Sequence, residues 1–581
     1  MVAPPSPTPP AADSGGRAGC VLQGVPVVVG ARYGPVIRPG QLPDVHREAA
    51  QGEAAQDVAE ADRLAEGERL AEGERLTAAA AVVAARLRDR AAHATGAASE
   101  LLATTATLAQ DRAWLGAAEK RIMEGAPAGR AVAAAVDQFA DRFTQLGGLM
   151  AERVTDLRDI GNRVIAELDG LPEPGVPPPE QPSILCAEDL SPADTAGLDP
   201  TLVVALATTL GGPTSHTAII ARQLGIPCVV AVSGLGDVPV GAMVLVDGTR
   251  GTVTVSPDRA AAREAVAEAQ RVAAQTVNWS GPGATSDGHA VALLANVQDG
   301  ASARSARETP AEGIGLFRTE LCFLSTPTEP SVAEQADIYT PVLEAFAGRK
   351  VVVRTLDAGS DKPLKFVAHP DEANPALGVR GIRVAEANPG LLTHQLEAIA
   401  AAAERTGNRP WVMAPMIATA QEAAGFADQA RSHGLTPGVM IEVPAAALLA
   451  ERILEHVDFL SIGTNDLTQY TMAADRMSAD LSTLTDPWQP AVLSLVAMTA
   501  RAGTAVGKPV GVCGEAAADP LLACVLTGLG VTSLSVAAAA VQAVGAKLAQ
   551  VTLQQCREAA DAVRSTASAH EARTAAWSVL G

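Results

Sequence analysis

The chain has 581 residues, a formal net charge of −21 and 48% apolar residues, while aromatic residues make up only 3%. This length corresponds to about four domains, or to fewer if one of them is a barrel. The acidic balance excludes nucleic acid or an anionic membrane surface as the main partner. The sequence contains no run of about 20 apolar residues, the length that a membrane span requires.

Residues 1–20 are rich in proline, serine and alanine and lack the basic-then-apolar order of a secretory signal. We therefore expect a disordered tail. The seven cysteines are scattered, odd in number and without a CxxC pair. This pattern predicts reduced thiols in a cytoplasmic protein, with neither a zinc site nor a disulfide framework.

Short apolar segments with glycine turns begin the ordered part of the chain, as in "GVPVVVGARYGPVIRP" (24–39). An alanine-rich, charged helical periodicity follows and ends before a proline cluster, after which strand-like and helix-like segments alternate again. The pattern predicts one α/β domain made of residues 21–45 and 168–258. A helical subdomain of residues 46–167 is inserted into it.

A connecting helix is expected within residues 259–287, and eight strand-like segments follow it in residues 288–581. These segments are "HAVALLANV", "GIGLFRTE", "KVVVRTLDAG", "WVMAPMI", "PGVMIEVPAA", "VDFLSIGTNDL", "KPVGVCGEA" and "VTSLSV". Most neighbours are separated by alanine-rich stretches of helix length. Eight such units in this length predict a (β/α)8 barrel, and thus an α/β multidomain chain.

Five of the predicted barrel strands change from apolar to polar at their carboxyl ends. The polar residues there are Arg318, Thr319 and Glu320; Arg354 and Asp357; Glu442; Asn465 and Asp466; and Cys513 and Glu515. A single strand-end residue of this kind is usually a solvated cap. Because barrel enzymes place their active sites at this rim, the whole set predicts a site.

The residue types in this set point to one kind of chemistry. Glu442 and Asp466 supply two hard oxygen ligands, which suit Mg²⁺ completed by water and substrate phosphate. Arginine side chains offer planar forks for phosphate oxygens. The arginines at strand ends are Arg318 and Arg354, and further cations on following loops are Lys362, Arg380 and Arg476. The set predicts phosphoryl transfer from an anionic substrate. Cys513 fits either a buried small hydrophobe or an acid beside the substrate.

One histidine stands out in "LGGPTSHTAIIARQLGIPCVV" (210–230). His216 lies among three hydroxyl residues at the start of a predicted helix, where free N–H groups and the helix dipole favour an anion. Gly211 and Gly212 permit close approach of the backbone. A neutral imidazole is a competent phosphoryl acceptor, so His216 is a candidate phosphohistidine. The alternative is an incidental polar residue in a capped helix.

Seven segments carry a family resemblance in order: "GGPTSHTAIIAR", "GIGLFRTE", "RTLDAGSDK", "NPALGVRGIR", "MIEVPAA", "SIGTNDLTQYTMAADR" and "GVCGE". From about residue 21 to 550 the chain resembles phosphoenolpyruvate-protein phosphotransferase, enzyme I of the bacterial sugar phosphotransferase system. The resemblance implies a swivelling phosphohistidine domain with an inserted helical bundle, followed by a phosphoenolpyruvate-binding barrel that forms a homodimer. It also implies that the 46–167 helices dock the small carrier protein HPr.

The resemblance implies a two-step relay, in which the phosphoryl group of phosphoenolpyruvate passes to His216 and then to a histidine of HPr. Pyruvate is released, and Cys513 is the proton donor. Mg²⁺ would be held by Glu442 and Asp466. The implied substrate-binding residues are Arg318, Arg354, Asn465, Asp466 and Arg476, with Lys362 and Arg380 assisting. Pro213 and Thr209 depart from the arginine and aspartate that are common in the family motif.

Two alternatives remain open at this point. A pyruvate-phosphate dikinase-like enzyme shares the histidine and the barrel, but it carries a large nucleotide-binding domain before the histidine. Only about 210 residues precede His216 here, and they contain no phosphate-cradling glycine-rich loop. The other alternative is a catalytically silent regulatory or scaffold paralogue.

Overall fold

The structure is a computed structural model. It describes residues 19–40, 64–93, 97–146, 148–177, 179–195, 198–212, 215–324, 326–359, 363–367, 372–476, 478, 481 and 483–581. The chain divides into two units. The first contains residues up to 270 together with 477–479, and the second contains residues 271–476 and 480–581. Each unit is described separately.

The first unit contains an eight-stranded sheet in the order β1-β8-β7-β3-β4-β5-β6-β2. Its strands are β1 (Cys20–Gln23), β2 (Val25–Val28), β3 (Ala31–Ile37), β4 (Ser183–Ala187), β5 (Val203–Thr208), β6 (Cys228–Val230), β7 (Met243–Asp247) and β8 (Thr252–Val255). The β3-β4-β5-β6 run is parallel, and the outer strands on both sides pair antiparallel. Two separate apolar clusters form on this sheet, because its central strands are Val-, Ala- and Leu-rich and buried on both faces.

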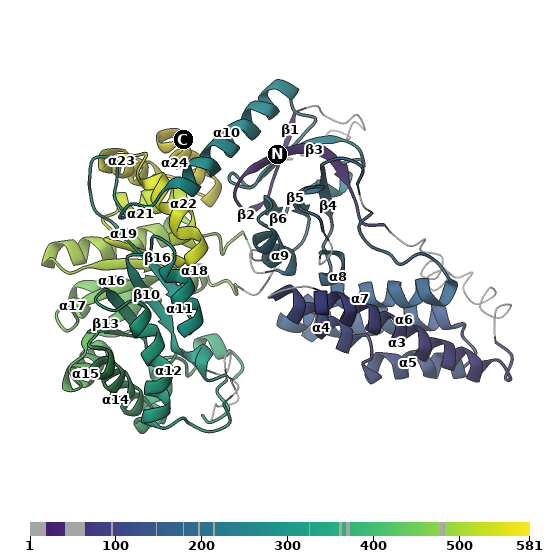
Figure 1. Ribbon diagram of the computed structural model, residues 1–581, viewed down its shortest axis with the longest axis horizontal. Helices are drawn as coiled ribbons and strands as arrows, with labels where there is room; N and C mark the ends of the chain where they lie inside the picture. Colours follow the sequence, from purple (N-terminus) through teal and green to yellow (C-terminus); the bar gives the residue numbers. More distant parts are fainter. Residues whose placement is uncertain are drawn as a thin grey trace, which may run out of the picture. The chain divides into compact units, whose positions relative to one another are not determined.

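Helices occupy the long stretch of sequence between β3 and β4 (Figure 1). They are α3 (Arg69–His93), α4 (Ala97–Leu108), α5 (Arg112–Met123), α6 (Ala128–Leu146) and α7 (Gly148–Asp169). Their shared core consists mainly of alanine, valine and leucine. These small side chains let the helices pack closely, and Trp114 is the one buried aromatic residue of the described cluster.

A buried arginine joins this bundle to the sheet. Arg163 on α7 is 1% exposed and pairs with Asp159 at 2.8 Å, with Glu173, and with Asp194 at 2.9 Å. Asp194 belongs to α8 (Pro192–Thr195), which follows β4. Burial is costly for an unpaired guanidinium, so the pairs with Glu173 and Asp194 attach α7 to the segments before and after β4.

The second unit is a closed barrel of eight parallel strands. Its strands are β9 (Ala292–Val297), β10 (Gly313–Arg318), β11 (Lys350–Arg354), β12 (Trp411–Ala414), β13 (Thr436–Ile441), β14 (Phe459–Gly463), β15 (Val510–Cys513) and β16 (Ser533–Ala537). Each strand coincides with one of the eight segments expected from the sequence. The barrel and the α/β sheet with its inserted helices confirm the predicted fold class.

The helices of the barrel unit lie outside the strands. The longer ones are α11 (Gly300–Arg307), α12 (Val332–Ala345), α14 (Pro389–Thr406), α15 (Ala420–Ser432), α18 (Thr464–Met472), α19 (Pro490–Val506), α21 (Pro520–Gly528), α22 (Val541–Leu548), α23 (Leu553–Arg564) and α24 (Ala569–Leu580). Shorter ones are α13 (Ile382–Ala387), α16 (Pro444–Leu448), α17 (Ala450–Leu454) and α20 (Glu515–Ala518). Helix α10 (Arg259–Asn278) leads along the chain from the first unit into the second.

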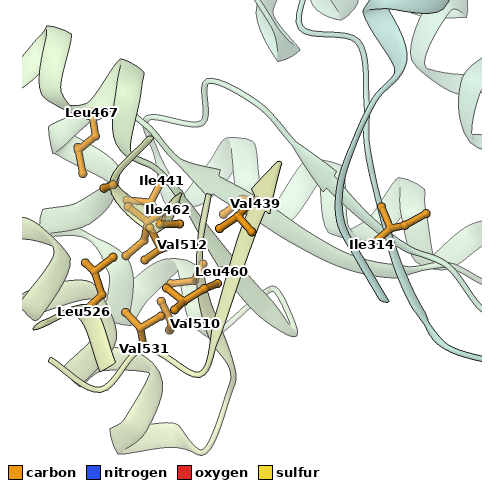
Figure 2. Packing of buried hydrophobic residues seen from close by; sticks show 14 of the residues in the cluster. Ile314, Val439, Ile441, Leu460, Ile462, Leu467, Val510, Val512, Leu526 and Val531 are labelled. Atoms are coloured by element: carbon orange, nitrogen blue, oxygen red, sulfur yellow. The ribbon is translucent and has the colours of Figure 1, made fainter. Parts of the chain in front are cut away.

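Alternation along the strands separates two apolar layers in the barrel. Val439 and Ile441 of β13 belong to the cluster shared with the helices, as do Val510 and Val512 of β15 (Figure 2). The intervening residues face the barrel interior, where Cys513 belongs to a smaller cluster with five other side chains. This alternation directs the Cys513 thiol inward at the end of its strand. None of the helices in the described part of the chain is long and apolar enough to cross a membrane.

Candidate active site

The predicted barrel residues that the structure describes gather at the carboxyl ends of the strands. Arg318, Arg354 and Cys513 are the last residues of β10, β11 and β15. Glu442 directly follows β13, and Asp466 lies in the first turn of α18, which begins where β14 ends. Because the strands are parallel, these positions share one rim. Lys362 lies outside the described residues.

Arg354 is paired with three carboxylates of the rim, and it is 5% exposed. Its Nη2 atom lies 2.5 Å from Glu320 Oε1, and its Nη1 atom lies 3.1 Å from Asp357 Oδ2 and 3.7 Å from Glu442 Oε1. Burial alone would lower the pKa of this guanidinium, but the three carboxylates raise it above its ordinary value. Arg354 is therefore a fixed positive charge at the centre of the site.

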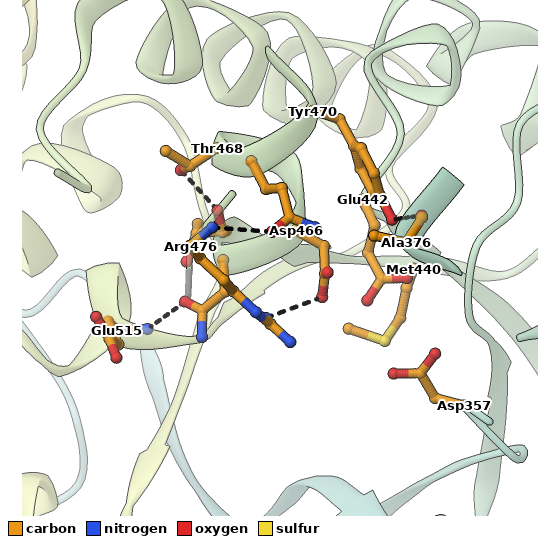
Figure 3. Close-up of polar contacts among 12 residues, drawn as sticks. Asp357, Ala376, Met440, Glu442, Asp466, Thr468, Tyr470, Arg476 and Glu515 are labelled. Atoms are coloured by element: carbon orange, nitrogen blue, oxygen red, sulfur yellow. Dashed lines mark hydrogen bonds and ion pairs between the residues drawn. The ribbon is translucent and has the colours of Figure 1, made fainter. Parts of the chain in front are cut away.

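A second arginine joins two of the carboxylates. Arg380 donates from Nε and Nη2 to the two oxygens of Asp357, at 3.1 and 3.2 Å, and from Nη1 to Asp466 at 3.0 Å. Tyr470 lies 3.4 Å from the same Nη1. The other oxygen of Asp466 accepts from Arg476 at 3.4 Å, as Figure 3 shows beside Glu442 and Asp357. The rim is thus an alternating network of buried acids and arginines.

Glu442 is 1% exposed, and its surroundings disfavour the charged form of its carboxyl group. Burial raises the pKa of its carboxyl group to about 7, and the nearby charges of Asp466 and Asp357 add to this effect. Its Oε2 atom accepts the backbone N–H of Met416 at 2.9 Å, and Met416 has a φ of +61°. Crowded buried carboxylates of this kind are the surroundings that a divalent cation stabilises.

The carboxylates do not form a closed metal site by themselves. Within the described ranges, no group of three or more His, Cys, Asp or Glu side chains is arranged to hold a metal ion. The charge of Asp466 raises the pKa of Glu442, and both carboxylates are paired with arginines. Mg²⁺ accepts a donor set of two carboxylates that is completed by oxygen ligands from substrate and water.

Arg318 differs from the other rim arginines because its guanidinium makes no hydrogen bond or ion pair with any residue that the structure describes. It is nevertheless close enough to Cys513 to lower the pKa of that thiol slightly, although burial dominates and raises the pKa to about 11. Cys513 donates to the carbonyl of Ile462 at 3.4 Å and lies 3.8 Å from Ser461 Oγ. Arg318, which has no partner in the described part of the chain, therefore lies at the same rim as a thiol that is protonated at neutral pH.

Asn465 is held by the turn that follows Cys513. Its Oδ1 atom accepts the backbone N–H of Glu515 at 3.1 Å. Gly514 has a φ of +96°, and a Cβ atom there would lie 2.7 Å from Asn465 Oδ1 and 2.5 Å from Thr464 Oγ1. Glycine is therefore required for the β15 turn to approach the start of α18 this closely.

Four residues take part in the site to which the sequence assigned no specific role. They are Glu320, Asp357, Met416 and Tyr470. Glu320 and Asp357 stood at strand ends, where a carboxylate near an arginine was a usable signal. Tyr470 donates to the carbonyl of Ala376 and lies within a motif that carried the family resemblance, whereas no sequence signal marked Met416.

His216 is in the first unit, as the first residue of α9 (His216–Leu224). The side chain of Ser215 caps the helix by accepting the N–H of Ala218 at 3.3 Å. Gly211 has a φ of +91°, which brings the preceding loop against Ser215. Thr217 is fully buried, and its Oγ1 atom has no partner in the described part of the chain, so this hydroxyl is not at the surface. Pro213 and Thr214 lie outside the described residues.

Three protein-family models match successive parts of the chain. Residues 23–153 match the family of PEP-utilising enzymes, N-terminal; residues 179–251 match PEP-utilising enzyme, mobile domain; and residues 273–553 match PEP-utilising enzyme, PEP-binding domain. His216 lies in the second match, and every rim residue described above lies in the third.

Individual relatives cover most of the chain. A phosphoenolpyruvate-protein phosphotransferase of Streptomyces coelicolor is 52% identical over 86% of this chain and 90% of its own length. Proteins of the same name from Haloferax volcanii and Bacillus subtilis are 39% and 37% identical. The first covers 76% of this chain and 80% of the relative, and the second covers 73% and 77%. These similarities agree with the barrel, with the acids and arginines at its rim, and with the histidine that begins α9. They show that the chain is an enzyme of the phosphoenolpyruvate-protein phosphotransferase family.

Proposed function

We propose that this enzyme transfers the phosphoryl group of phosphoenolpyruvate to His216 and then to a histidine of HPr, as the first step of the sugar phosphotransferase system. The single observation that supports this most strongly is the presence of Arg318 and Cys513 at the same rim, each as the last residue of its strand. A guanidinium with no partner among the described residues suits a phosphorylated carboxylate, and a protonated thiol at the same rim suits the acid that the enolate requires.

Binding of phosphoenolpyruvate would rearrange the charges of the rim. No described residue pairs with the guanidinium of Arg318, which would receive the substrate, whereas Arg354, Arg380 and Arg476 are paired with carboxylates. A substrate anion offers these arginines new partners, and Asn465 adds an amide donor. Lys362, outside the described residues, is proposed to assist. The substrate therefore competes with Glu442 and Asp466 for the arginines.

Mg²⁺ fits the carboxylates that this exchange would release. Glu442 and Asp466 would hold the ion, which would neutralise phosphate charge when bound. Burial of Glu442 next to two other acids already favours a positive ion at this place. The arginines of the rim thus suit the substrate, and its carboxylates suit the metal. In the structure, these arginines and carboxylates neutralise one another.

The transfer itself breaks the bond between phosphorus and the enol oxygen of phosphoenolpyruvate and forms a bond between phosphorus and an imidazole nitrogen of His216. The enolate that remains takes a proton at its methylene carbon from the thiol of Cys513, which yields pyruvate. Burial keeps this thiol protonated at neutral pH. His216 receives the phosphoryl group at the start of a capped helix, where backbone N–H groups stabilise its charge.

The remaining parts of the chain complete the proposal. Movement of the α/β part would carry phosphorylated His216 from the barrel to HPr, which would dock on the helices α3–α7. The barrel would form a homodimer. The matches to a mobile domain and to a PEP-binding domain support this division of labour.

The test is labelling of the full chain with phosphoenolpyruvate that carries radioactive phosphorus, in the presence of Mg²⁺. The expected result is an acid-labile phosphoprotein that forms in the wild type, is absent in His216→Ala and loses its label when HPr is added. A fully labelled His216→Ala protein would refute the acceptor assignment. Labelling of His216 by ATP without phosphoenolpyruvate would indicate a dikinase instead, and a wild type that takes no label would indicate a silent paralogue.

A further inference from the structure

A chain of polar side chains is buried behind the ends of β10 and β11, under helices α12 and α14. Its members are Thr319, Gln335, Tyr339 and Gln395, and none is more than 3% exposed. They lie within a layer in which the neighbouring side chains are apolar, such as Val342 and Leu396. Buried polar groups are costly in such a layer unless each is hydrogen-bonded. A network of four such side chains therefore calls for a functional explanation.

Gln395 on α14 is the centre of this network. Its Oε1 atom accepts the backbone N–H of Leu356 at 3.0 Å. Its Nε2 atom donates to Thr319 Oγ1 at 3.0 Å and to the hydroxyl of Tyr339 at 3.2 Å. Thr319 Oγ1 in turn donates to the carbonyl of Arg354 at 2.8 Å. One amide therefore joins the segment after β10 to the segment after β11 and attaches both to an outer helix.

Tyr339 fixes the outer side of the amide. Its hydroxyl donates to Gln335 Oε1 at 3.1 Å, and Gln335 donates to the carbonyl of Pro330 at 2.9 Å. The Tyr339 ring packs edge-on against Phe317 and Phe323, with centroid distances of 5.8 and 6.3 Å. The carbonyl and both N–H groups of the Gln395 amide are thus in use, and rotation of this side chain breaks several bonds at once.

The backbone that this network holds carries the anion-binding side chains. Thr319 lies between Arg318 and Glu320, and Leu356 directly precedes Asp357. Glu320 and Asp357 are the carboxylates that hold the guanidinium of Arg354. A displacement of about 1 Å in groups that bind a reacting substrate is enough to cost up to 100-fold in rate. Gln395 is well placed to prevent such a displacement although it does not reach the rim.

We propose that Gln395 is a positioning residue for phosphoenolpyruvate. It fixes the segments 318–320 and 354–357 relative to each other. In this way it sets the affinity of Arg318 and Arg354 for the phosphorylated substrate. This inference rests on the proposed function, because it assumes that Arg318 and Arg354 bind phosphoenolpyruvate. It assigns to helix α14 a part in substrate binding that is separate from its packing on the barrel.

The test is Gln395→Met in the full chain, since methionine has a similar size and cannot make the three hydrogen bonds. The KM for phosphoenolpyruvate in Mg²⁺-dependent phosphorylation is expected to rise about 10-fold, and kcat is expected to fall less than about threefold. Tyr339→Phe removes only one of the three partners of the amide and is expected to raise KM less.

Asn408→Ala is the matched control. Asn408 is an 8% exposed amide that follows the far end of α14 and donates to the carbonyls of Leu343 and Phe346, at 3.3 and 3.2 Å. It precedes β12, at the amino end of the barrel. Its loss is expected to lower thermal stability to a similar degree and to leave KM unchanged. Equal KM increases in both variants, or an unchanged KM in Gln395→Met, would overturn the proposal.

Arg354→Met separates this inference from the proposed function. If Arg354→Met leaves KM unchanged, the substrate contact itself is wrong. If Arg354→Met raises KM and Gln395→Met does not, the substrate contact stands and only the positioning role of Gln395 fails.

Discussion

Asp357 and Arg380 form a two-point ion pair, with nitrogen–oxygen distances of 3.1 and 3.2 Å, and neither residue is more than 1% exposed. Asp357 also lies 3.1 Å from Arg354, so one buried carboxylate neutralises part of two guanidinium groups. Buried charges that lose their partner are far more costly than exposed ones. Asp357 is therefore the counter-ion on which two of the proposed substrate arginines depend.

The first prediction concerns this carboxylate. Asp357→Asn removes a negative charge between two buried arginines, and the free energy of unfolding of the barrel is expected to fall by about 3–5 kcal/mol. Urea unfolding measures the change. Asp337→Asn is the control, because Asp337 pairs with Arg405 at 2.6 Å but is 72% exposed, and its loss is expected to cost at most about 1 kcal/mol. Similar losses in both variants would contradict the prediction.

A second prediction concerns the proposed metal ligands. Glu442→Gln is expected to keep the fold, because glutamine still offers an oxygen to the N–H of Met416 and the native carboxyl group is destabilised by burial. The rate of Mg²⁺-dependent phosphorylation is expected to fall at least about 100-fold, since several kcal/mol of charge stabilisation is removed. Asp466→Asn should behave in the same way.

The measurement for both ligand variants is the rate of labelling across a Mg²⁺ titration, with circular dichroism to check the fold. Undiminished labelling at low Mg²⁺ would count against these two residues as ligands. A loss of rate that excess Mg²⁺ restores would support them, because it identifies weakened ion binding as the cause.

The third prediction concerns pH and lies at the opposite end of the barrel. Lys350 is the first residue of β11, and its amine lies 3.8 Å from the ring centroid of Trp411 and 5.7 Å from that of Phe459. It borders a small interior cavity, and no ion pair of this amine is found among the described residues. Burial lowers its pKa from 10.5 to about 8.

Between pH 8 and 10.5 the folded protein therefore binds fewer protons at Lys350 than the unfolded chain, so this residue makes stability rise with pH across that window. Below pH 8 the amine of Lys350 is protonated in the folded protein, and the full cost of burying its charge applies. Attraction to the two aromatic rings offsets part of this cost. Lys350→Met is expected to raise the free energy of unfolding at pH 7 by about 1 kcal/mol, and the difference should shift steadily in favour of the wild type as the pH rises from 8 to 10.5.

Urea unfolding followed by tryptophan fluorescence at pH 7 and at high pH tests the Lys350 prediction. Lys365→Met, at an exposed position of the same unit, is the control, because it removes the same charge without relieving burial. If Lys350→Met is less stable than the wild type at pH 7, attraction between the amine and the rings outweighs the cost of burial.

Much of the barrel and of its rim was predictable from the sequence. Each strand is a short apolar segment whose polar residues begin where the strand ends, and a parallel barrel necessarily brings such ends together. Arg318, Arg354 and Cys513 illustrate this, because each is the last residue of its strand. The residue types of a site formed by strand ends can therefore be recognised in short stretches of sequence.

The partners of these residues were not predictable in the same way. Arg380 was expected to neutralise substrate charge, but nothing in its loop indicated that it pairs with Asp357 and Asp466. Gln395 is one of several polar residues on α14, and its contacts with Thr319 and Leu356 depend on how this helix packs over two strands. Pairing of distant side chains is decided by packing, which local sequence patterns do not encode.

The last prediction separates the proton donor from the other buried cysteines. Cys513 faces the barrel interior at the rim, and burial raises the pKa of its thiol to about 11, so it is a neutral acid at pH 7. Cys513→Ala removes this acid without removing a charge or a substrate contact. Pyruvate formation is expected to slow about 100- to 10,000-fold, the usual contribution of a positioned acid, while the KM for phosphoenolpyruvate changes little.

Cys524→Ala is the matched control for Cys513→Ala. Cys524 is also fully buried in the barrel unit, but it lies on α21, within the layer between strands and helices. Its replacement is expected to leave the rate of pyruvate formation unchanged. The two variants are compared by following pyruvate release in a single turnover. Equal rates for Cys513→Ala and the wild type would show that the enolate takes its proton from another group, and the thiol would then be a packing residue of the barrel interior.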